Sequence, residues 1–146
     1  MKLAIGSDHR GFATKEIIQN TITMHNDNVT WVDVGAFNDE SSDYPVFAKA
    51  VCELILQGRV DAGVLLCGTG VGIAMAANRY KKIYAALAWN KEVARLSREH
   101  DFANILVLPA DFLSAEDAVD CVRAWLYAEP LEGRHKMRVE MIDKLG

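Results

Sequence analysis

The sequence predicts an α/β fold, a doubly wound three-layer αβα sandwich built on a five-stranded parallel sheet. Two observations carry this prediction. Short apolar runs alternate with amphipathic stretches along the whole chain, which is the pattern of repeated βαβ units. The runs are also apolar enough to be strands that are buried on both faces. Right-handed crossovers then favour the strand order 2-1-3-4-5, with the switch point between the first and third strands.

The five runs that predict strands are Leu3–Gly6, Thr30–Val34, Ala62–Cys67, Tyr84–Ala88 and Ile105–Leu108. Helical spacing with few helix breakers predicts helices over Gly11–Met24, Val46–Gln57, Val71–Arg79, Lys91–Glu99 and Ala115–Leu126. Ser114 is suited to cap the last of these helices. A further helix over Gly133–Leu145 is too polar to form a core layer, so we expect it to pack on a partner or over the site.

Size and charge limit the function classes. At 146 residues, with 51% hydrophobic and 25% charged residues, the chain has room for a single domain over 1–146, whose tail from about 130 we expect on a partner subunit. The net charge of −4 argues against nucleic-acid and membrane partners, so a bound anion needs a local basic cluster. No apolar run has the length of a membrane span, and the opening MKLAIGSDH lacks the core of a signal peptide. We therefore expect a cytoplasmic protein.

The three cysteines, Cys52, Cys67 and Cys121, are odd in number and widely spaced. They indicate neither a disulfide framework nor a zinc site or redox pair, in keeping with a reducing compartment. We expect no metal and no cofactor.

The most informative motif is Cys67-Gly68-Thr69-Gly70-Val71-Gly72, which follows the third predicted strand directly. Ligands of doubly wound sheets bind beyond the carboxyl ends of the strands at the switch point, and the first strand ends at Ser7-Asp8-His9. A carboxylate, an imidazole, a thiol and a glycine-rich loop are thus expected to meet, although they lie about sixty residues apart. Each also has a structural interpretation, since such an aspartate often caps a helix and a buried cysteine is usually inert.

The loop departs from three known anion-binding motifs. A dinucleotide fingerprint needs a different glycine spacing, a cysteine phosphatase needs arginine where Ile73 stands, and a P-loop needs Gly-Lys-Ser or Gly-Lys-Thr. A compact oxyanion or phosphate cradle beside a thiolate remains.

The basic cluster lies in the tail, where Arg134 and Arg138 are four residues apart and share one face of the predicted helix. Two guanidinium groups at this spacing can grip a phosphate monoester. The alternative is a solvated basic face paired with Glu132 or Glu140. His100, before the fifth strand, is on its own more often structural than catalytic.

Several motifs occur in order along the chain: Asp8-His9-x-Gly11-Phe12, Asp43-Tyr44-Pro45, the Cys67 loop with Ile73, Ala76-Ala77-Asn78, Ser97-Arg98-x-His100, Asn104 and Gly133-Arg134-His135-x-x-Arg138. Taken together, these motifs resemble the ribose-5-phosphate isomerase B family, which also includes galactose-6-phosphate isomerase subunits and allose-6-phosphate isomerases. The resemblance spans nearly the whole chain. It implies an αβα sandwich that acts as a metal-free aldose–ketose isomerase on ribose 5-phosphate and ribulose 5-phosphate, as a homodimer or homotetramer.

The resemblance also implies residue roles. Cys67 would be the general base that moves a proton between C1 and C2 through an enediolate, with its thiolate favoured by Thr69. The loop N–H groups of Gly68, Gly70, Val71 and Gly72 would stabilise the enediolate oxygen. His100 would open the furanose ring and would serve the partner's Cys67. The residues implied in substrate binding are Asp8 for the sugar hydroxyls, Tyr44 and Asp101, and His9, Arg134 and Arg138 for the phosphate.

Position 73 distinguishes the branches of the family, and two further positions depart from its pattern. One branch uses a glutamate base where Ile73 stands, which leaves Cys67 as the only base of the loop. Asp101 replaces the usual asparagine, and Asp111 replaces an arginine of the phosphate site. Either the tail arginines with His9 suffice, or phosphate affinity is lower, or another basic residue substitutes. The alternatives are a hexose 6-phosphate substrate, allose or galactose 6-phosphate, and a non-catalytic sugar-phosphate-binding module.

Overall fold

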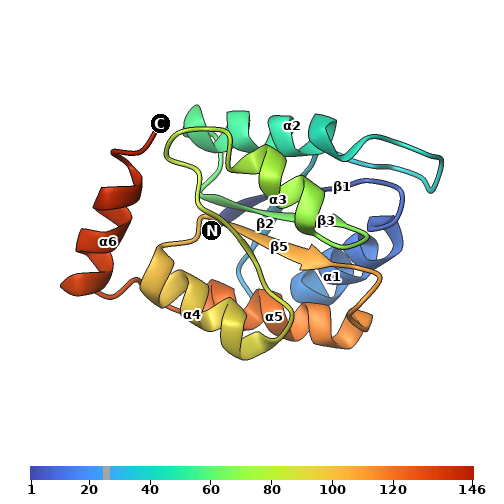
Figure 1. Ribbon diagram of the computed structural model, residues 1–146. Coiled ribbons are helices and arrows are strands. Elements are labelled where there is room, and N and C mark those ends of the chain that lie inside the picture. Colours follow the sequence, from blue (N-terminus) through green and yellow to red (C-terminus); the bar gives the residue numbers. More distant parts are fainter. Residues whose placement is uncertain (25–26) are drawn as a thin grey trace.

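The computed structural model describes residues 1–24 and 27–146 (Figure 1). Its strands are β1 (Lys2–Ser7), β2 (Thr30–Asp33), β3 (Ala62–Cys67), β4 (Ala85–Leu87) and β5 (Ile105–Pro109), and all their pairings are parallel. Its helices are α1 (Phe12–Met24), α2 (Tyr44–Leu56), α3 (Val71–Ala77), α4 (Lys91–Asp101), α5 (Ala115–Tyr127) and α6 (Arg134–Ile142). The predicted fold class is confirmed, and each element lies within a few residues of its expected place.

Among the helix boundaries that differ from the expected ones, two have clear reasons. Helix α2 begins at Tyr44 because Pro45 fits the first turn of a helix, where no N–H partner is required. Helix α4 continues to Asp101 and ends where Phe102 takes a left-handed conformation with φ 57°. His100 and Asp101 therefore belong to the last turn of α4 and not to a loop.

The strand order is β2-β1-β3-β5-β4, so the expected order 2-1-3-4-5 is wrong in its last two positions. Strand β5 pairs with β3 in the interior of the sheet, and β4 forms the edge. All five residues of β5 are buried, whereas the three residues of β4 are only half-buried. The longer, bulkier apolar strand takes the interior because burial there removes more apolar surface from water. The switch point between β1 and β3 is unaffected.

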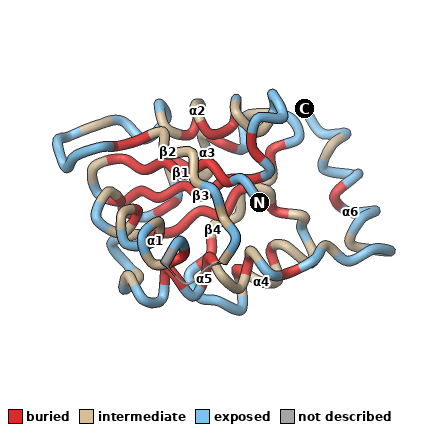
Figure 2. The backbone as a smooth tube through the Cα atoms, turned by 180° about the vertical axis from the view of Figure 1, so that it is seen from behind, coloured by how far each residue is buried: buried red, intermediate tan, exposed pale blue. Residues whose placement is uncertain are grey.

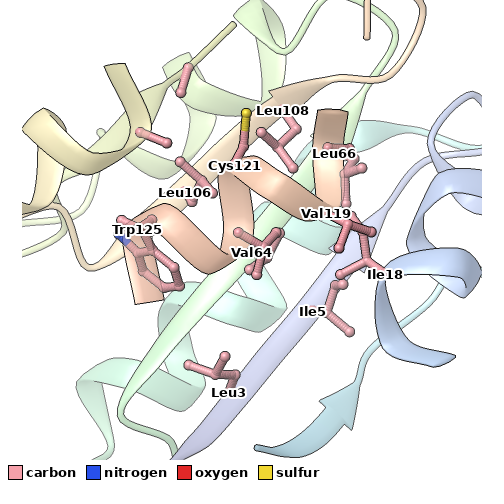
Figure 3. Packing of buried hydrophobic residues seen from close by; sticks show 14 of the residues in the cluster. Leu3, Ile5, Ile18, Val64, Leu66, Leu106, Leu108, Val119, Cys121 and Trp125 are labelled. Atoms are coloured by element: carbon pink, nitrogen blue, oxygen red, sulfur yellow. The ribbon is translucent and has the colours of Figure 1, made fainter. Parts of the chain in front are cut away.

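Side chains along the inner strands alternate between two hydrophobic cores, one on each face of the sheet. Val64 and Leu66 of β3 pack with residues of α1 and α5, including Trp125 (Figure 3). Leu65 and Cys67 pack on the other face with residues of α2 and α3. The buried strands lie between helices whose outer sides are exposed (Figure 2). This alternation places the Cys67 side chain in the layer next to α2 and α3.

Helix α6 stands apart from the two layers and packs beside α4 (Figure 1). Asp143 at its carboxyl end accepts hydrogen bonds from Lys82 and from the Tyr84 hydroxyl, both near the start of β4. The Leu131 N–H donates to the Glu99 carbonyl, 2.8 Å away, and fixes the chain as it enters α6. The tail is thus attached near the amino ends of the strands.

The interior position of β5 makes a test of the strand order possible. Leu106→Ala should lower the free energy of unfolding by about 2–5 kcal/mol, because it leaves a cavity in the fully buried part of the sheet. Leu87→Ala, on edge strand β4, should cost clearly less. Urea unfolding of both variants measures the difference. Equal losses at the two positions would contradict the unequal burial of the two strands.

Candidate active site

A cavity of about 540 Å³ opens at the carboxyl ends of β1 and β3. The two strands pair with Ser7 opposite Leu66, and the Asp8 N–H donates to the Leu66 carbonyl, 3.3 Å away. The residues after both strands therefore meet, as predicted for the switch point. The cavity is lined by Asp8, Arg10, Tyr44, Cys67, Gly68, Thr69, Val71, Gly72, Asp111 and Phe112.

Cys67 lies at the bottom of the glycine-rich loop and is only 4% exposed. Its Sγ accepts a hydrogen bond from the Gly70 N–H at 3.2 Å. Gly70 has φ 75°, and a Cβ there would lie 2.5 Å from Leu87, so conformation and space both require glycine. The loop thereby holds a backbone donor against the thiol.

The two other cysteines are core residues with no access to this cavity. Burial raises the pKa of Cys52 to about 12 and that of Cys121 to about 11. The Cys52 thiol faces the Ala77 carbonyl, 3.7 Å away. The expectation of free cysteines agrees with the structure, which has no disulfide among its described residues.

Asp8 both holds the turn before α1 and lines the cavity. One carboxylate oxygen accepts hydrogen bonds from the N–H groups of Arg10 at 3.0 Å and Gly11 at 3.3 Å, and so holds the turn that leads into α1. The same side chain, in a residue 5% exposed, lines the cavity. A structural contact thus fixes the carboxylate beside Cys67.

His9 is held by the segment between β2 and α2. Its N–H donates to Ser42 Oγ at 3.0 Å, and its Nδ1 accepts from the Ser42 N–H at 3.2 Å. With Nδ1 as an acceptor, the proton of a neutral imidazole sits on Nε2, which is then a donor for an anion or a hydroxyl.

The loop after Cys67 receives side chains from its neighbours. The Tyr44 ring lies against Gly72, where an added Cβ would be 2.6 Å from the ring. Thr69 Oγ1 accepts from the Val71 N–H at 3.1 Å and so satisfies the first N–H group of α3. Glycine at position 72 thus lets the tyrosine form one wall of the cavity.

Two charged residues of the cavity were not assigned to the site from sequence. The Arg10 guanidinium, which follows Asp8 and His9, donates through Nε and Nη2 to Asp111 Oδ2. Asp111 lies after β5 and was noted only as a carboxylate in place of an arginine. The position of Arg10, next to the expected cluster, was the available signal in the sequence.

The remaining predicted site residues lie near the amino ends of the strands, at the opposite end of the sheet from the cavity. Helices that follow parallel strands run back toward the amino ends of those strands, so α4 carries His100 and Asp101 away from Cys67. Asp101 borders a different cavity of about 420 Å³, together with Tyr84 and Ile142. Arg134 and Arg138 are in α6, beside α4. Within one chain, these four residues do not meet the Cys67 loop.

His100 and His135 connect α4 to α6. Their rings stack with centroids 4.1 Å apart and planes 1° apart. Partial desolvation and the nearby His100, Arg134 and Arg138 lower the pKa of His135, which favours a neutral ring in the stack. On α6, Lys136 pairs with Glu132 at 3.7 Å, whereas no salt bridge in the described part of the chain involves Arg134 or Arg138.

None of the described residues form a group of three or more His, Cys, Asp or Glu side chains that could hold a metal ion. Of the helices in the same part of the chain, none is long and apolar enough to cross a membrane.

Comparisons with known proteins agree over almost the whole chain. The profile of the ribose/galactose isomerase family matches residues 3–142. Ribose-5-phosphate isomerase B of Escherichia coli is 40% identical over 142 residues, which are 97% of this chain and 93% of that protein. The structure of a ribose 5-phosphate isomerase from Thermotoga maritima is similar with a TM-score of 0.95 at 44% identity, over 99% of this chain and 98% of that one.

A ligand-bound relative is also similar. The structure of ribose-5-phosphate isomerase B from Mycoplasma genitalium with bound ribulose-5-phosphate has a TM-score of 0.92 at 36% identity, over 98% of this chain and 94% of that one. The family match and the relatives together cover both the cavity loops and the tail. The chain therefore belongs to the ribose/galactose isomerase family, which confirms the resemblance seen in its motifs and the expectation of an enzyme.

Proposed function

We propose that the protein interconverts ribose 5-phosphate and ribulose 5-phosphate. The observation that carries the proposal is the joint placement of Asp8 and Cys67 with a glycine-rich loop in one cavity. This cavity belongs to a chain similar to enzymes named for that activity, one of them with ribulose-5-phosphate bound. A binding protein has no need for a thiol held against a backbone donor.

The proposed chemistry is a proton transfer through an enediolate. In the open-chain aldose, Cys67 takes the C2 proton as the C1 carbonyl oxygen gains negative charge. The proton returns to C1, the proton of the C2 hydroxyl passes to the C1 oxygen, and C2 becomes the ketone carbon. The N–H groups of Gly70 and Val71 are already bonded to Cys67 and Thr69, so the amides of Gly68, Thr69 and Gly72 are better suited to the oxyanion.

The other half of the site would come from a second copy of the chain. His100 lies in the last turn of α4, and Arg134 and Arg138 lie in α6, which is attached near the amino ends of the strands, whereas Cys67 lies at the carboxyl end of β3. In a symmetric dimer, the amino ends of the strands of one subunit can face the carboxyl ends of the strands of the other, which creates two equivalent sites. His100 would then open the ring of a sugar held by the partner's Cys67, and the two arginines would bind its phosphate. The monomer would bind substrate poorly.

The rival substrate is a hexose 6-phosphate, since the family profile covers isomerases of both ribose and galactose. The chemistry at C1 and C2 is the same for both sugars. The choice depends on the distance from the reacting carbons to the phosphate-binding arginines, which is one carbon longer in a hexose. Direct comparison of the two substrates decides it.

Purified protein should turn over ribose 5-phosphate with a higher kcat/KM than allose or galactose 6-phosphate. Cys67→Ala should lower kcat about 10²- to 10⁴-fold, because the reaction loses its general base. A coupled assay measures both, with Cys121→Ala as a control that removes a core thiol and retains activity. If Cys67→Ala keeps a kcat near that of the unmodified protein, the assignment of the base is wrong.

Alkylation tests the thiol directly. At pH 8, iodoacetamide should modify Cys67 about tenfold faster than Cys52 or Cys121, because their raised pKa values keep both core thiols protonated. Ribose 5-phosphate should slow the reaction at Cys67 only. Mass spectrometry of the labelled peptides gives the three rates. Equal rates in the folded protein would contradict a distinct environment for Cys67.

Mixing of two inactive variants tests the shared site. After subunit exchange, equal amounts of Cys67→Ala and His100→Asn should recover about a quarter of the full activity, because half of the dimers are mixed and each has one intact site. Each variant alone is the control. A mixture that stays as inactive as its components, although mass spectrometry shows mixed dimers, would place Cys67 and His100 of one subunit in the same site.

A further inference from the structure

Arg10 and Asp111 form an ion pair that lines the Cys67 cavity. Arg10 belongs to the loop after β1 and Asp111 to the loop after β5, so the pair spans the end of β3 that lies between them. Asp111 is also anchored from below, because its N–H donates to the Gly68 carbonyl at 3.0 Å. The two side chains thus lie directly on the loop that carries the thiol.

Gly68 makes this close approach possible. A Cβ at that position would lie 2.6 Å from Arg10 Nε and 2.8 Å from Asp111 Oδ2. The guanidinium therefore rests on the residue next to Cys67, without a side chain in between.

The geometry of the pair leaves part of the guanidinium free. Asp111 Oδ2 accepts from both Nε and Nη2 of Arg10. The Nη1 group takes no part in this contact, and the Arg10 side chain is 58% exposed against 30% for Asp111. Because the carboxylate fixes the orientation of the fork, an arriving anion meets an arginine that is already ordered.

Charge in the cavity makes this arginine significant. The lining residues include the carboxylates of Asp8 and Asp111, and Arg10 is the one Lys or Arg among them. A phosphate monoester carries a charge of about −1.5 to −2 at pH 7. Without Arg10, the only Asp, Glu, Lys or Arg side chains in the described lining of this cavity would be the two carboxylates, which repel such a substrate.

We propose that Arg10, ordered over Gly68 by Asp111, binds the phosphate of the substrate through its free Nη1 edge and thereby supplies this chain's own cation to the site. This inference rests on the proposed function, since it takes the ligand to be a sugar phosphate. It assigns to Arg10 the place of the missing basic residue at position 111. The contact between Arg10 and the phosphate is made equally in the ground state and in the transition state. Its loss should therefore raise KM and leave kcat unchanged.

A rival explanation gives Arg10 a smaller part. Its charge could merely neutralise Asp111, so that the acid does not repel the substrate. The two explanations differ in the double variant Arg10→Gln with Asp111→Asn, which removes both charges. Neutralisation alone predicts that the double variant binds substrate as well as the unmodified protein does.

The experiment compares Arg10→Gln, Arg10→Lys and the double variant by KM for ribose 5-phosphate and by inhibition with inorganic phosphate. Arg10→Gln should raise KM and the inhibition constant of phosphate about tenfold or more, with kcat within about threefold. Arg10→Lys should be intermediate, because it keeps the charge and loses the planar fork. The double variant should remain impaired. Arg59→Gln, an exposed arginine after α2, is the matched control and should change neither constant.

Recovery of the original KM in the double variant would overturn the proposal, as would a phosphate inhibition constant that Arg10→Gln leaves unchanged. If no sugar phosphate is turned over, the proposed function fails separately. Calorimetric titration with inorganic phosphate then tests Arg10 alone: weaker binding by Arg10→Gln than by the unmodified protein supports the contact, and equal or absent binding in both overturns it.

Discussion

The parallel pairing of β1 with β3 is the constraint on which the site depends. Its register sets Ser7 opposite Leu66, so Asp8, the first residue after β1, lies beside Cys67, the last residue of β3. The helices that follow leave toward opposite faces, α1 into one core and α3 into the other. The crevice between the departing chains becomes the cavity. The geometry of the candidate site is thus a consequence of strand order.

The same topology separates the two groups of predicted site residues. A crossover helix that starts near the carboxyl ends of the strands must end near their amino ends, and α4 therefore carries His100 away from Cys67. Helix α6 comes later in the chain and is fixed near the same amino ends through Asp143. A right-handed βαβ fold cannot bring both groups together within one chain. A second subunit resolves this conflict without any change in the fold, which is why the shared site is the economical proposal.

Much of this arrangement could be predicted because it depends on local pattern. The apolar run that ends at Cys67, and the polar residues that follow β1, identify strand ends wherever the strands lie in the sheet. The order of β4 and β5 could not be predicted in this way, because periodicity shows that a strand is buried and not which strand it pairs with. The Arg10 contact was missed for a related reason. Its partner Asp111 is 101 positions away, and each residue alone reads as an exposed surface charge.

The glycines of the loop show how these long-range contacts shape a short motif. Gly68 and Gly72 have no left-handed backbone angle to explain them, in contrast to Gly70. Both are needed for space, since a Cβ would lie 2.6 Å from Arg10 at Gly68 and 2.6 Å from Tyr44 at Gly72. Arg10 comes from the loop after β1 and Tyr44 is the first residue of α2, so the glycine spacing reflects what these two segments place over the cysteine. A loop that resembles a dinucleotide fingerprint in composition can therefore serve a different ligand, because its glycines admit side chains of the protein itself.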